Sequence, residues 1–157
     1  MTNSSTSISS LDLAGGFVDF TIDQLDAADV AQLKKLMLDH IACVLCGAAQ
    51  PVGKHLVAWA AENGAPGQAM LFGSGRSAGA AAAALVNGTS AHGYELDDTH
   101  DGSMSHPGAV VISTALALGA ERGASGADIM AAITVGYEAM ARTGMAAGSL
   151  GIVTAGF

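Results

Sequence analysis

Apolar residues recur at three- and four-residue steps along most of the chain, which is the spacing of one face of an α-helix. The first such run follows Asp26, a residue suited to capping a helix N-terminus, and ends at Gly47. Lys34 and Lys35 fall on the opposite side of the run. Its apolar positions are Val30, Leu33, Met37, Ile41, Val44 and Leu45. The pattern predicts an amphipathic helix between these two signals.

The same spacing predicts two more helices before the middle of the chain. One covers residues 52–63, where Gly64 stops the pattern and Pro66 prevents it from resuming. The glycine-rich stretch LFGSGRSAG interrupts the periodicity, and an alanine-rich helix over about residues 78–92 follows it. This stretch lacks the Lys-Ser/Thr of a phosphate-binding loop, so we expect a turn in which Arg76 pairs with an acid or contacts an anionic ligand.

Two further helix starts are marked in the last third of the chain. Pro107 suits the first position of a helix, where its missing N–H costs nothing. Ser125 lies three residues before Asp128, which is the spacing of a capping box. No segment alternates cleanly between apolar and polar residues over the length of a strand. The sequence therefore predicts an all-α fold with one short strand near Met70.

The two ends of the chain depart from this pattern. Residues 1–14 begin MTNSSTSISS and predict a flexible Ser/Thr-rich tail, which leaves residues 15–157 for a helical domain. The final GMAAGSLGIVTAGF is apolar, uncharged and broken by glycines, which is unusual for the end of a domain. We therefore expect the folded unit to include further polypeptide.

The composition supports this expectation. Half of the residues are apolar, but the aromatic residues are only four Phe, two Tyr and one Trp, beside 21 glycines. Small side chains bury little area each, and they allow helices to approach closely. A core of this kind suits tightly packed helices that complete their burial against further chain or a partner.

Charge and hydropathy argue against several classes of partner. The net charge is −8 with only six Lys and Arg, which disfavours nucleic acid and anionic lipid surfaces. No apolar run reaches the about 20 residues that span a bilayer. The first residues also lack the basic and apolar regions of a secretory signal. We expect a cytoplasmic protein that binds neither nucleic acid nor a membrane.

Cys43 and Cys46 form a C-x-x-C pair within the first long helix. Such a pair can be a redox centre or half of a zinc site, but there is no second pair and no histidine at zinc-finger spacing. We therefore expect both cysteines to be small buried residues on one face of that helix.

The ionisable chemistry is concentrated in HGYELDDTHDGSMSHPG, residues 92–108, which holds three of the five histidines and four acids. A solvated loop at a helix start would account for Asp97 and Asp98, but not for the grouped histidines. A calcium loop would need a bidentate Glu where Gly108 stands, and the His-Glu-x-x-His spacing of zinc hydrolases is absent. A transition metal held by scattered His and Asp stays open as an alternative.

Acid–base catalysis accounts for more of this segment. His106 stands immediately before a predicted helix N-terminus, where the N–H of Gly108 and the helix dipole could hold an anionic substrate. Thr99 can donate a hydrogen bond, and Glu95 can orient the substrate or shuttle a proton. The segment therefore predicts a proton-transfer site for a substrate that carries a carboxylate.

The segment and its flanks resemble a known family. The string LFGSGRSAGAAAAALVNGTSAHGYELDDTHDGSMSHPGAVVISTALALGA is similar to the MmgE/PrpD family, as are LKKLMLDHIACVLCGA before it and GADIMAAITVGYE after it. The family includes 2-methylcitrate dehydratase, cis-aconitate decarboxylase and iminodisuccinate epimerase, and the likeness covers about residues 15–157. It implies the N-terminal portion of a large all-α domain, with the family's smaller α+β lid domain absent from this chain.

The resemblance also implies properties of the site. It implies no metal and no organic cofactor, a homodimeric assembly, and a pocket for small di- or tricarboxylates. Glu95 matches a position that is usually aspartate in the decarboxylase branch, Thr99 matches the pocket threonine, and His106 matches the histidine before proline. These three are the predicted catalytic residues. The predicted substrate-binding residues, from the motif, the helix start and the glycine turn, are Asp98, His100, Gly108 and Arg76.

Part of the family's site lies beyond this sequence. The residue that matches Phe157 is ordinarily followed by a second active-site histidine in a His-Pro-Thr-like motif, and by lysines and the lid. We therefore expect half of an acid–base site in a lyase that removes water or CO2 next to a carboxylate, completed by a second chain. Cleavage or truncation at Phe157 is the alternative origin of such a chain. An epimerase and a non-catalytic helical partner subunit are the alternative functions.

Overall fold

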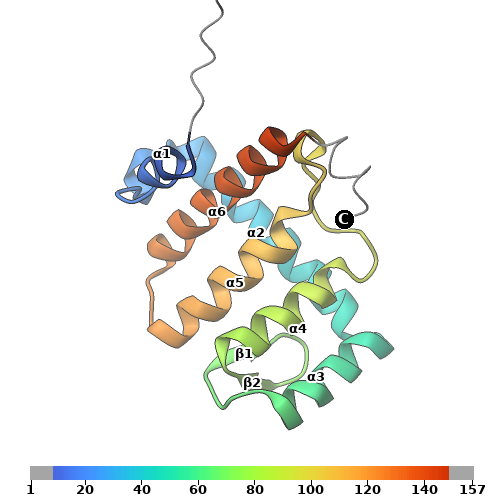
Figure 1. Ribbon diagram of the computed structural model, residues 1–157. Coiled ribbons are helices and arrows are strands. Elements are labelled where there is room, and N and C mark those ends of the chain that lie inside the picture. Colours follow the sequence, from blue (N-terminus) through green and yellow to red (C-terminus); the bar gives the residue numbers. More distant parts are fainter. Residues whose placement is uncertain (1–8, 149–157) are drawn as a thin grey trace, which may run out of the picture.

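The computed structural model of the chain describes residues 9–148, which are mainly helical (Figure 1). The helices are α1 (Ser10–Gly15), α2 (Ala27–Ala48), α3 (Pro51–Asn63), α4 (Ala80–His92), α5 (Pro107–Arg122) and α6 (Gly126–Ala147), with 3-10 turns η1 (Ile22–Gln24) and η2 (Asp101–Ser103). Strands β1 (Ala69–Leu71) and β2 (Arg76–Ala78) pair antiparallel. The predicted all-α class is confirmed, and the strand expected near Met70 is one half of a small hairpin.

The starts of the long helices follow the capping signals in the sequence. The Asp26 carboxylate accepts hydrogen bonds from two backbone N–H groups in the first turn of α2, at 2.7 and 2.9 Å. Ser125 and Asp128 form a reciprocal capping box at the start of α6, and Pro107 is the first residue of α5. The Asp26 and Ser125–Asp128 side chains satisfy N–H donors that the first turn of a helix leaves unpaired, and Pro107 has no N–H to satisfy. The three predicted starts are confirmed.

The N-terminal region is helical earlier than the sequence indicated. Ser9 and Asp12 form a second capping box, in which Ser9 Oγ accepts from the Asp12 N–H at 3.2 Å and the Asp12 carboxylate accepts from the Ser9 N–H at 2.9 Å. Helical structure therefore begins at Ser10, inside the tail expected over residues 1–14, although α1 contributes no buried residue. Residues 1–8 of that tail, and the apolar C-terminal segment from residue 149, lie outside the described residues.

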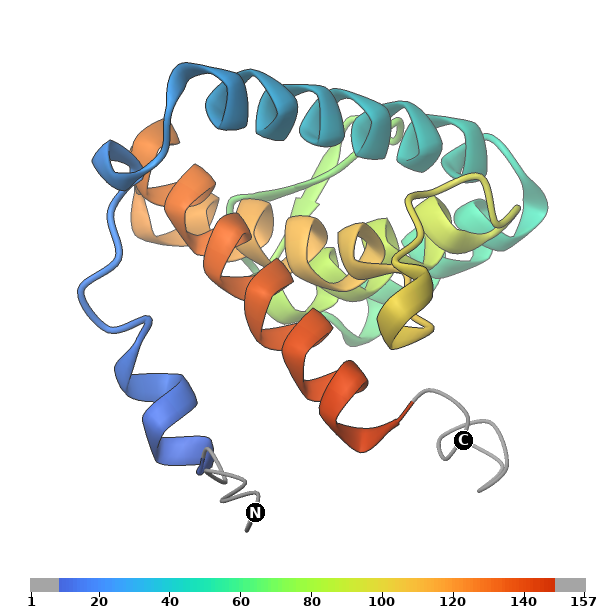
Figure 2. The ribbon, with the colours of Figure 1, turned by 90° about the horizontal axis from the view of Figure 1, so that it is seen from above.

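α4 is the central helix of the packing and contacts α2, α3 and α5. Figure 2 shows α2 running along one side of α4 and α5. Glycines allow these close contacts: a Cβ at Gly47 of α2 would overlap the Ser90 carbonyl of α4. A Cβ at Gly88 of α4 would lie 2.5 Å from the Ala109 carbonyl oxygen of α5. The close helix packing expected from the small side chains is confirmed.

The buried apolar residues of the described chain form three clusters. One joins the hairpin, α3 and α4 around Leu71, and another joins α2, α5 and α6 around Ile112. A third, around Val44 of α2 and Ala91 of α4, lies at the C-terminal end of α4. This packing fixes the C-terminal end of α4, where the loop to α5 begins.

The two cysteines differ in burial, although both lie on α2 and both are free. Cys43 is buried and Cys46 is exposed. Residues three apart on a helix differ by about 60° around its axis, and near its end α2 buries a face too narrow to include both. The expectation of two buried cysteines is therefore wrong for Cys46.

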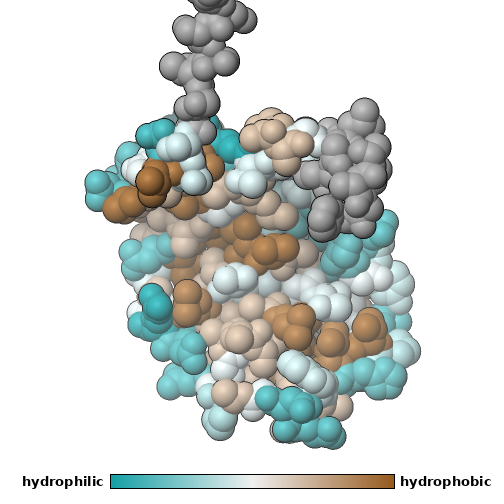
Figure 3. Space-filling model, in the orientation of Figure 1, coloured by the Kyte–Doolittle hydropathy of each residue, from teal (hydrophilic) through white to brown (hydrophobic). Residues whose placement is uncertain are grey.

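Apolar surface remains exposed on the described chain. Figure 3 shows apolar side chains gathered across the face that carries α4, α5 and α6. Leu85 of α4 and Val110 of α5 are 49% and 56% exposed, which is high for large apolar residues. Taken singly, none of the helices in residues 9–148 has both the length and the apolar character of a membrane span, and α2 with α3 passes that test only as a pair bent by 89°.

Candidate active site

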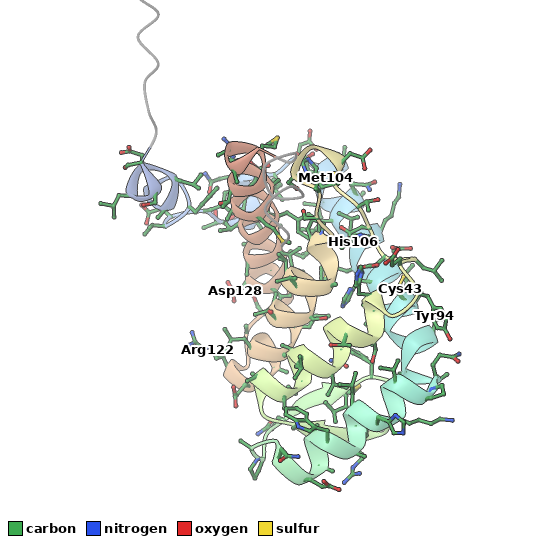
Figure 4. All side chains as sticks on the ribbon, turned by 45° about the vertical axis from the view of Figure 1, so that its right-hand side comes forward. Cys43, Tyr94, Met104, His106, Arg122 and Asp128 are labelled. Atoms are coloured by element: carbon green, nitrogen blue, oxygen red, sulfur yellow. The ribbon has the colours of Figure 1, made fainter. Side chains whose placement is uncertain are left out.

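An open pocket of about 700 Å³ lies between the C-terminal half of α4 and the N-terminal half of α5. Its larger apolar lining residues are Leu85, Met104, Val110 and Met140, and its polar ones are Thr89, His92, Ser105, His106 and Thr114. Figure 4 shows His106 at the start of α5, beside the C-terminal end of α4. The two ionisable groups of this lining are the imidazoles at residues 92 and 106.

The two imidazoles meet at one buried carboxylate. His92 is the last residue of α4, and its Nδ1 lies 3.1 Å from Oδ1 of Asp97. His106 Nδ1 lies 3.4 Å from the same oxygen, and the two rings pack edge to face with centroids 4.5 Å apart. The Asp97 side chain is 1% exposed, whereas the imidazoles of His92 and His106 are 45% and 30% exposed. These three side chains form the His-Asp-His cluster.

The Asp97 carboxylate constrains the chemistry of both rings. Within residues 9–148, its hydrogen-bonding and ion-pairing partners are His92 and His106. An Nδ1–H that points at a carboxylate fixes the tautomer of a neutral imidazole and leaves Nε2 as the basic nitrogen. A buried carboxylate also favours positive charge beside it. The three ligand atoms lie within 4.8 Å of one another, so the same side chains could hold a metal ion.

The neighbouring Asp98 has a different role. Its Oδ1 accepts a hydrogen bond from the Gly108 N–H at 2.9 Å, and its Oδ2 accepts one from the Tyr137 hydroxyl at 2.7 Å. Burial, and then the Asp98 carboxylate, raise the pKa of Tyr137 well above its usual value. Asp98 therefore caps α5 and ties it to α6.

This contact corrects the expectation that the Gly108 N–H is free to hold an anionic substrate. The donor is already occupied by Asp98, and the carboxylate of Asp98 is occupied in turn by two donors. A Cβ at Gly108 would lie 2.5 Å from Asp98 Oδ1, so the contact also requires glycine at this position. Asp98 and Gly108, which were predicted to bind substrate, instead connect α5 to α6 in this structure.

Glu95 and Thr99, the other two predicted catalytic residues, are both exposed and are not among the residues that line the pocket. Glu95 has a φ of 51°, in the left-handed region that few non-glycine residues adopt. The pocket is therefore lined by His106 and His92, and it does not bring the three predicted catalytic residues together. The catalytic roles of Glu95 and Thr99 stay predictions.

His100 and Arg76, which were predicted to bind substrate, lie elsewhere. His100 Nδ1 lies 2.8 Å from Ser103 Oγ and accepts a hydrogen bond from the Ser103 N–H at 3.2 Å, so its imidazole caps η2. Arg76 is exposed on β2, just before the start of α4, whereas the cluster lies at the other end of this helix. A helix of this length separates the two by about 20 Å. In this structure, neither side chain lines the pocket.

Sequence reasoning placed His106 at the site and missed His92 and Asp97 as its partners. His92 was visible as the first histidine of the same segment and as the end of the predicted α4. No feature of the sequence distinguishes Asp97 from Asp98, because the direction in which each carboxylate points depends on how α4, α5 and α6 pack.

Comparisons with known proteins connect this geometry to a family. The family model described as the MmgE/PrpD N-terminal domain matches residues 12–151. The chain is 33% identical over 129 residues to cis-aconitate decarboxylase of Aspergillus terreus, covering 79% of this chain and 26% of that protein. It is 32% identical over 127 residues to cis-aconitate decarboxylase-like protein oryM of Aspergillus oryzae, covering 76% and 26%. No solved structure matches the chain significantly. The chain thus spans about a quarter of the length of these relatives.

Proposed function

Because the chain belongs to the MmgE/PrpD family, we propose that it carries part of the active site of a lyase acting on a small di- or tricarboxylate. The relatives bear the names of a cis-aconitate decarboxylase and a decarboxylase-like protein, so cis-aconitate is the first substrate to test. The observation that carries the proposal is His106, whose imidazole lines the pocket with its Nδ1 directed at the buried Asp97 carboxylate.

His106 is the proton donor or acceptor in this proposal. In a decarboxylation, the bond to the departing carboxylate breaks, CO2 leaves with the electron pair remaining on the substrate, and the protonated Nε2 delivers a proton to carbon. In a dehydration, the neutral Nε2 removes the proton next to a carboxylate while hydroxide leaves. Asp97 supports both directions, because its negative charge, 3.4 Å from His106 Nδ1, stabilises the imidazolium.

The pocket supports a site that further polypeptide completes. Its lining includes no Lys or Arg, so among these residues a bound polycarboxylate would meet positive charge only on a protonated imidazole. The apolar side chains of Leu85 and Val110 remain exposed beside it. The relatives also extend far beyond the matched region. We propose that a second polypeptide supplies the cations and covers this face.

The proposal is tested by assaying cis-aconitate turnover with the 157-residue chain alone and with the complex purified together with its partner. We expect turnover only in the complex. There, His106→Ala should lower kcat by about 100- to 10,000-fold, the usual contribution of a general acid or base. His55→Ala, at an exposed position on α3, is the matched control and should leave kcat unchanged.

Each other outcome has a definite meaning. Turnover by the isolated chain would overturn the half-site. Full activity of His106→Ala in the complex would overturn the acid–base role and favour a non-catalytic helical subunit. Incorporation of solvent deuterium into a dicarboxylate without loss of water or CO2 would identify an epimerase instead.

A further inference from the structure

We propose that His92 is a second catalytic residue of this site, a general acid that protonates the departing hydroxyl group while His106 removes a proton from carbon. This inference rests on the proposed function and narrows it to a dehydration. Elimination of water from a hydroxy acid needs a proton removed from carbon and another delivered to oxygen, because hydroxide leaves poorly unless it is protonated. The two imidazoles at the pocket can divide these tasks between them.

Both imidazoles face the same cavity from different helices. His92 ends α4 and His106 directly precedes α5, and both line the pocket of about 700 Å³. Their ring centroids are 4.5 Å apart, with the ring planes at 62° to each other. The other polar groups of this lining are hydroxyls, which are weak acids near neutral pH. Two rings this close can act on neighbouring atoms of one small substrate.

The Asp97 carboxylate orients the His92 ring. His92 Nδ1 lies 3.1 Å from Oδ1 and 3.3 Å from Oδ2 of Asp97, whose side chain is 1% exposed. In residues 9–148, the hydrogen-bonding contacts of this imidazole are made through Nδ1. The ring is nevertheless 45% exposed and lines the pocket, so Nε2 is the nitrogen available to a substrate. A carboxylate held at Nδ1 fixes the ring and stabilises its protonated form.

The contacts with Asp97 give the two rings different roles. His106 Nδ1 lies 3.4 Å from Asp97 Oδ1, which is long for a hydrogen bond, and this buried nitrogen has no hydrogen-bond partner among the described residues. The carboxylate therefore stabilises positive charge on His92 in preference to His106. Two protonated rings this close would repel each other, and one carboxylate compensates only one of them. His92 is thus the protonated donor and His106 the neutral acceptor.

The elimination balances with these two groups alone. Nε2 of neutral His106 takes the proton from the carbon next to a carboxylate, and the electrons of that C–H bond form the C=C bond. The C–O bond breaks, and its oxygen takes the proton from Nε2 of His92, so that water leaves. The step ends with His106 protonated and His92 neutral. Both rings are partly exposed, so exchange with solvent after product release restores the starting state.

The test compares two substrates that give the same product. Citrate must lose its hydroxyl group to give cis-aconitate, whereas the analogue with fluorine in that position loses fluoride, which leaves without a proton. In the complex with the second polypeptide, His92→Asn keeps a side-chain N–H for Asp97 and removes Nε2. We expect it to lower kcat for citrate by about 100- to 10,000-fold, and kcat for the fluoro analogue by less than about 10-fold. The corresponding pair made from 2-methylcitrate is assayed alongside.

Three further variants complete the comparison. His106→Ala should lower kcat for the hydroxy and the fluoro substrates alike, because both must lose a proton from carbon. His55→Asn makes the same change at an exposed position on α3 and should leave both rates unchanged. If His92→Asn fails to fold, His92→Ala is assayed with imidazole in the buffer, which should restore turnover of the hydroxy substrate.

The outcomes separate this inference from the proposed function. Equal losses on the hydroxy and fluoro substrates in folded His92→Asn would overturn the acid role. Full turnover of the hydroxy substrate by that variant would also overturn it and would place the acid on the second polypeptide. Decarboxylation of cis-aconitate without dehydration of citrate or 2-methylcitrate would overturn this inference and leave the proposed function standing. Full activity of His106→Ala would overturn the acid–base role in the proposed function itself.

Discussion

Asp97 and Asp98 are neighbours of identical chemistry that point to different parts of the fold. The Asp97 carboxylate contacts two imidazoles at the pocket, and the Asp98 carboxylate joins the start of α5 to α6. Single-residue changes can therefore separate the chemistry of the site from the stability of the helices that carry it.

Removing the Tyr137 hydroxyl tests the structural half of this pair. Tyr137→Phe leaves Asp98 Oδ2 without its 2.7 Å hydrogen bond, so we expect the free energy of unfolding to fall by about 1–3 kcal/mol. Urea denaturation measures this change. Glu138→Gln is the control, since its exposed ion pair with Arg142 should contribute less than about 1 kcal/mol. Equal stabilities of Tyr137→Phe and the unmodified chain would show that Asp98 does not tie the helices together.

His40 predicts a dependence of stability on pH. It is 3% exposed, with Nε2 lying 3.0 Å from Ser113 Oγ, and burial lowers its pKa, although Asp98 and other acids partly oppose this. The unfolded chain then binds a proton near pH 6.5 that the folded chain binds only at lower pH. The contribution of His40 is fully present above about pH 6.5 and is lost as pH falls toward the folded-state pKa.

We therefore expect His40→Gln to make the loss of stability between about pH 7 and pH 5 less steep, by up to about 1.4 kcal/mol per pH unit. Urea denaturation across this range measures the slope. His55→Gln, at an exposed position, should retain the original slope. Parallel pH profiles for His40→Gln and the unmodified chain would contradict the effect assigned to burial.

At the scale of single elements, the helices were the predictable part of the structure. Asp26, Pro107 and the Ser125–Asp128 pair mark helix starts through local hydrogen bonding and backbone geometry, which a sequence displays directly. The exposure of Cys46 was not predictable, because it depends on which parts of α2 the other helices cover. The left-handed backbone at Glu95, outside the pocket, likewise depends on the path between two packed helices.

Two identical capping boxes in different settings give a matched experiment. Ser125→Ala removes the cap of α6, which carries the buried Ile133, so we expect a loss of about 0.5–2 kcal/mol in global stability. Ser9→Ala removes the same motif from α1, which buries no residue, and should leave the global transition unchanged. Chemical denaturation followed by circular dichroism compares the two. A larger loss of stability in Ser9→Ala than in Ser125→Ala would contradict the finding that α6 contributes to the core and α1 does not.

The contact between α2 and α4 is open to a similar comparison. Gly47→Ala places a methyl group against the Ser90 carbonyl, and the resulting displacement of the helices should cost about 1–3 kcal/mol. Gly126→Ala has open space around its added methyl group, so it should be neutral or stabilising by up to about 1 kcal/mol. Thermal unfolding of both variants measures the difference. If Gly47→Ala matched Gly126→Ala, the two helices would not be in contact at this point.

At the scale of the whole molecule, the site belongs to no single element. His92 ends α4, Asp97 lies in the loop, and His106 precedes α5, so the cluster exists only once both helices have packed. This is why periodicity and motif spacing identified the segment and His106, but not the partners of that imidazole. Periodicity predicted the all-α class and the family resemblance agreed with it, but neither could supply the position of Asp97.

The exposed apolar face supports a whole-molecule prediction that rests on the proposed partner. Val110 is 56% exposed, so Val110→Asn should change the stability of the isolated chain by no more than about 0.5 kcal/mol. In the complex, the same change should weaken association with the second polypeptide, which analytical ultracentrifugation measures. Glu121→Gln, an exposed change in the last turn of α5, is the control and should leave association unaffected. Unaltered association of Val110→Asn would show that the partner does not cover this face.

His92 lies at the C-terminal end of α4 and His106 at the N-terminal end of α5, so the distance between their rings depends on how the two helices are aligned. Gly88 of α4 touches the Ala109 carbonyl of α5 one turn or so from each ring, so sliding or tilting either helix alters the 4.5 Å between the ring centroids. A molecule that binds both helices from outside would therefore change the distance between the two imidazoles without contacting them. The position of the His106 imidazole and the packing of α4 against α5 thus depend on the same few contacts.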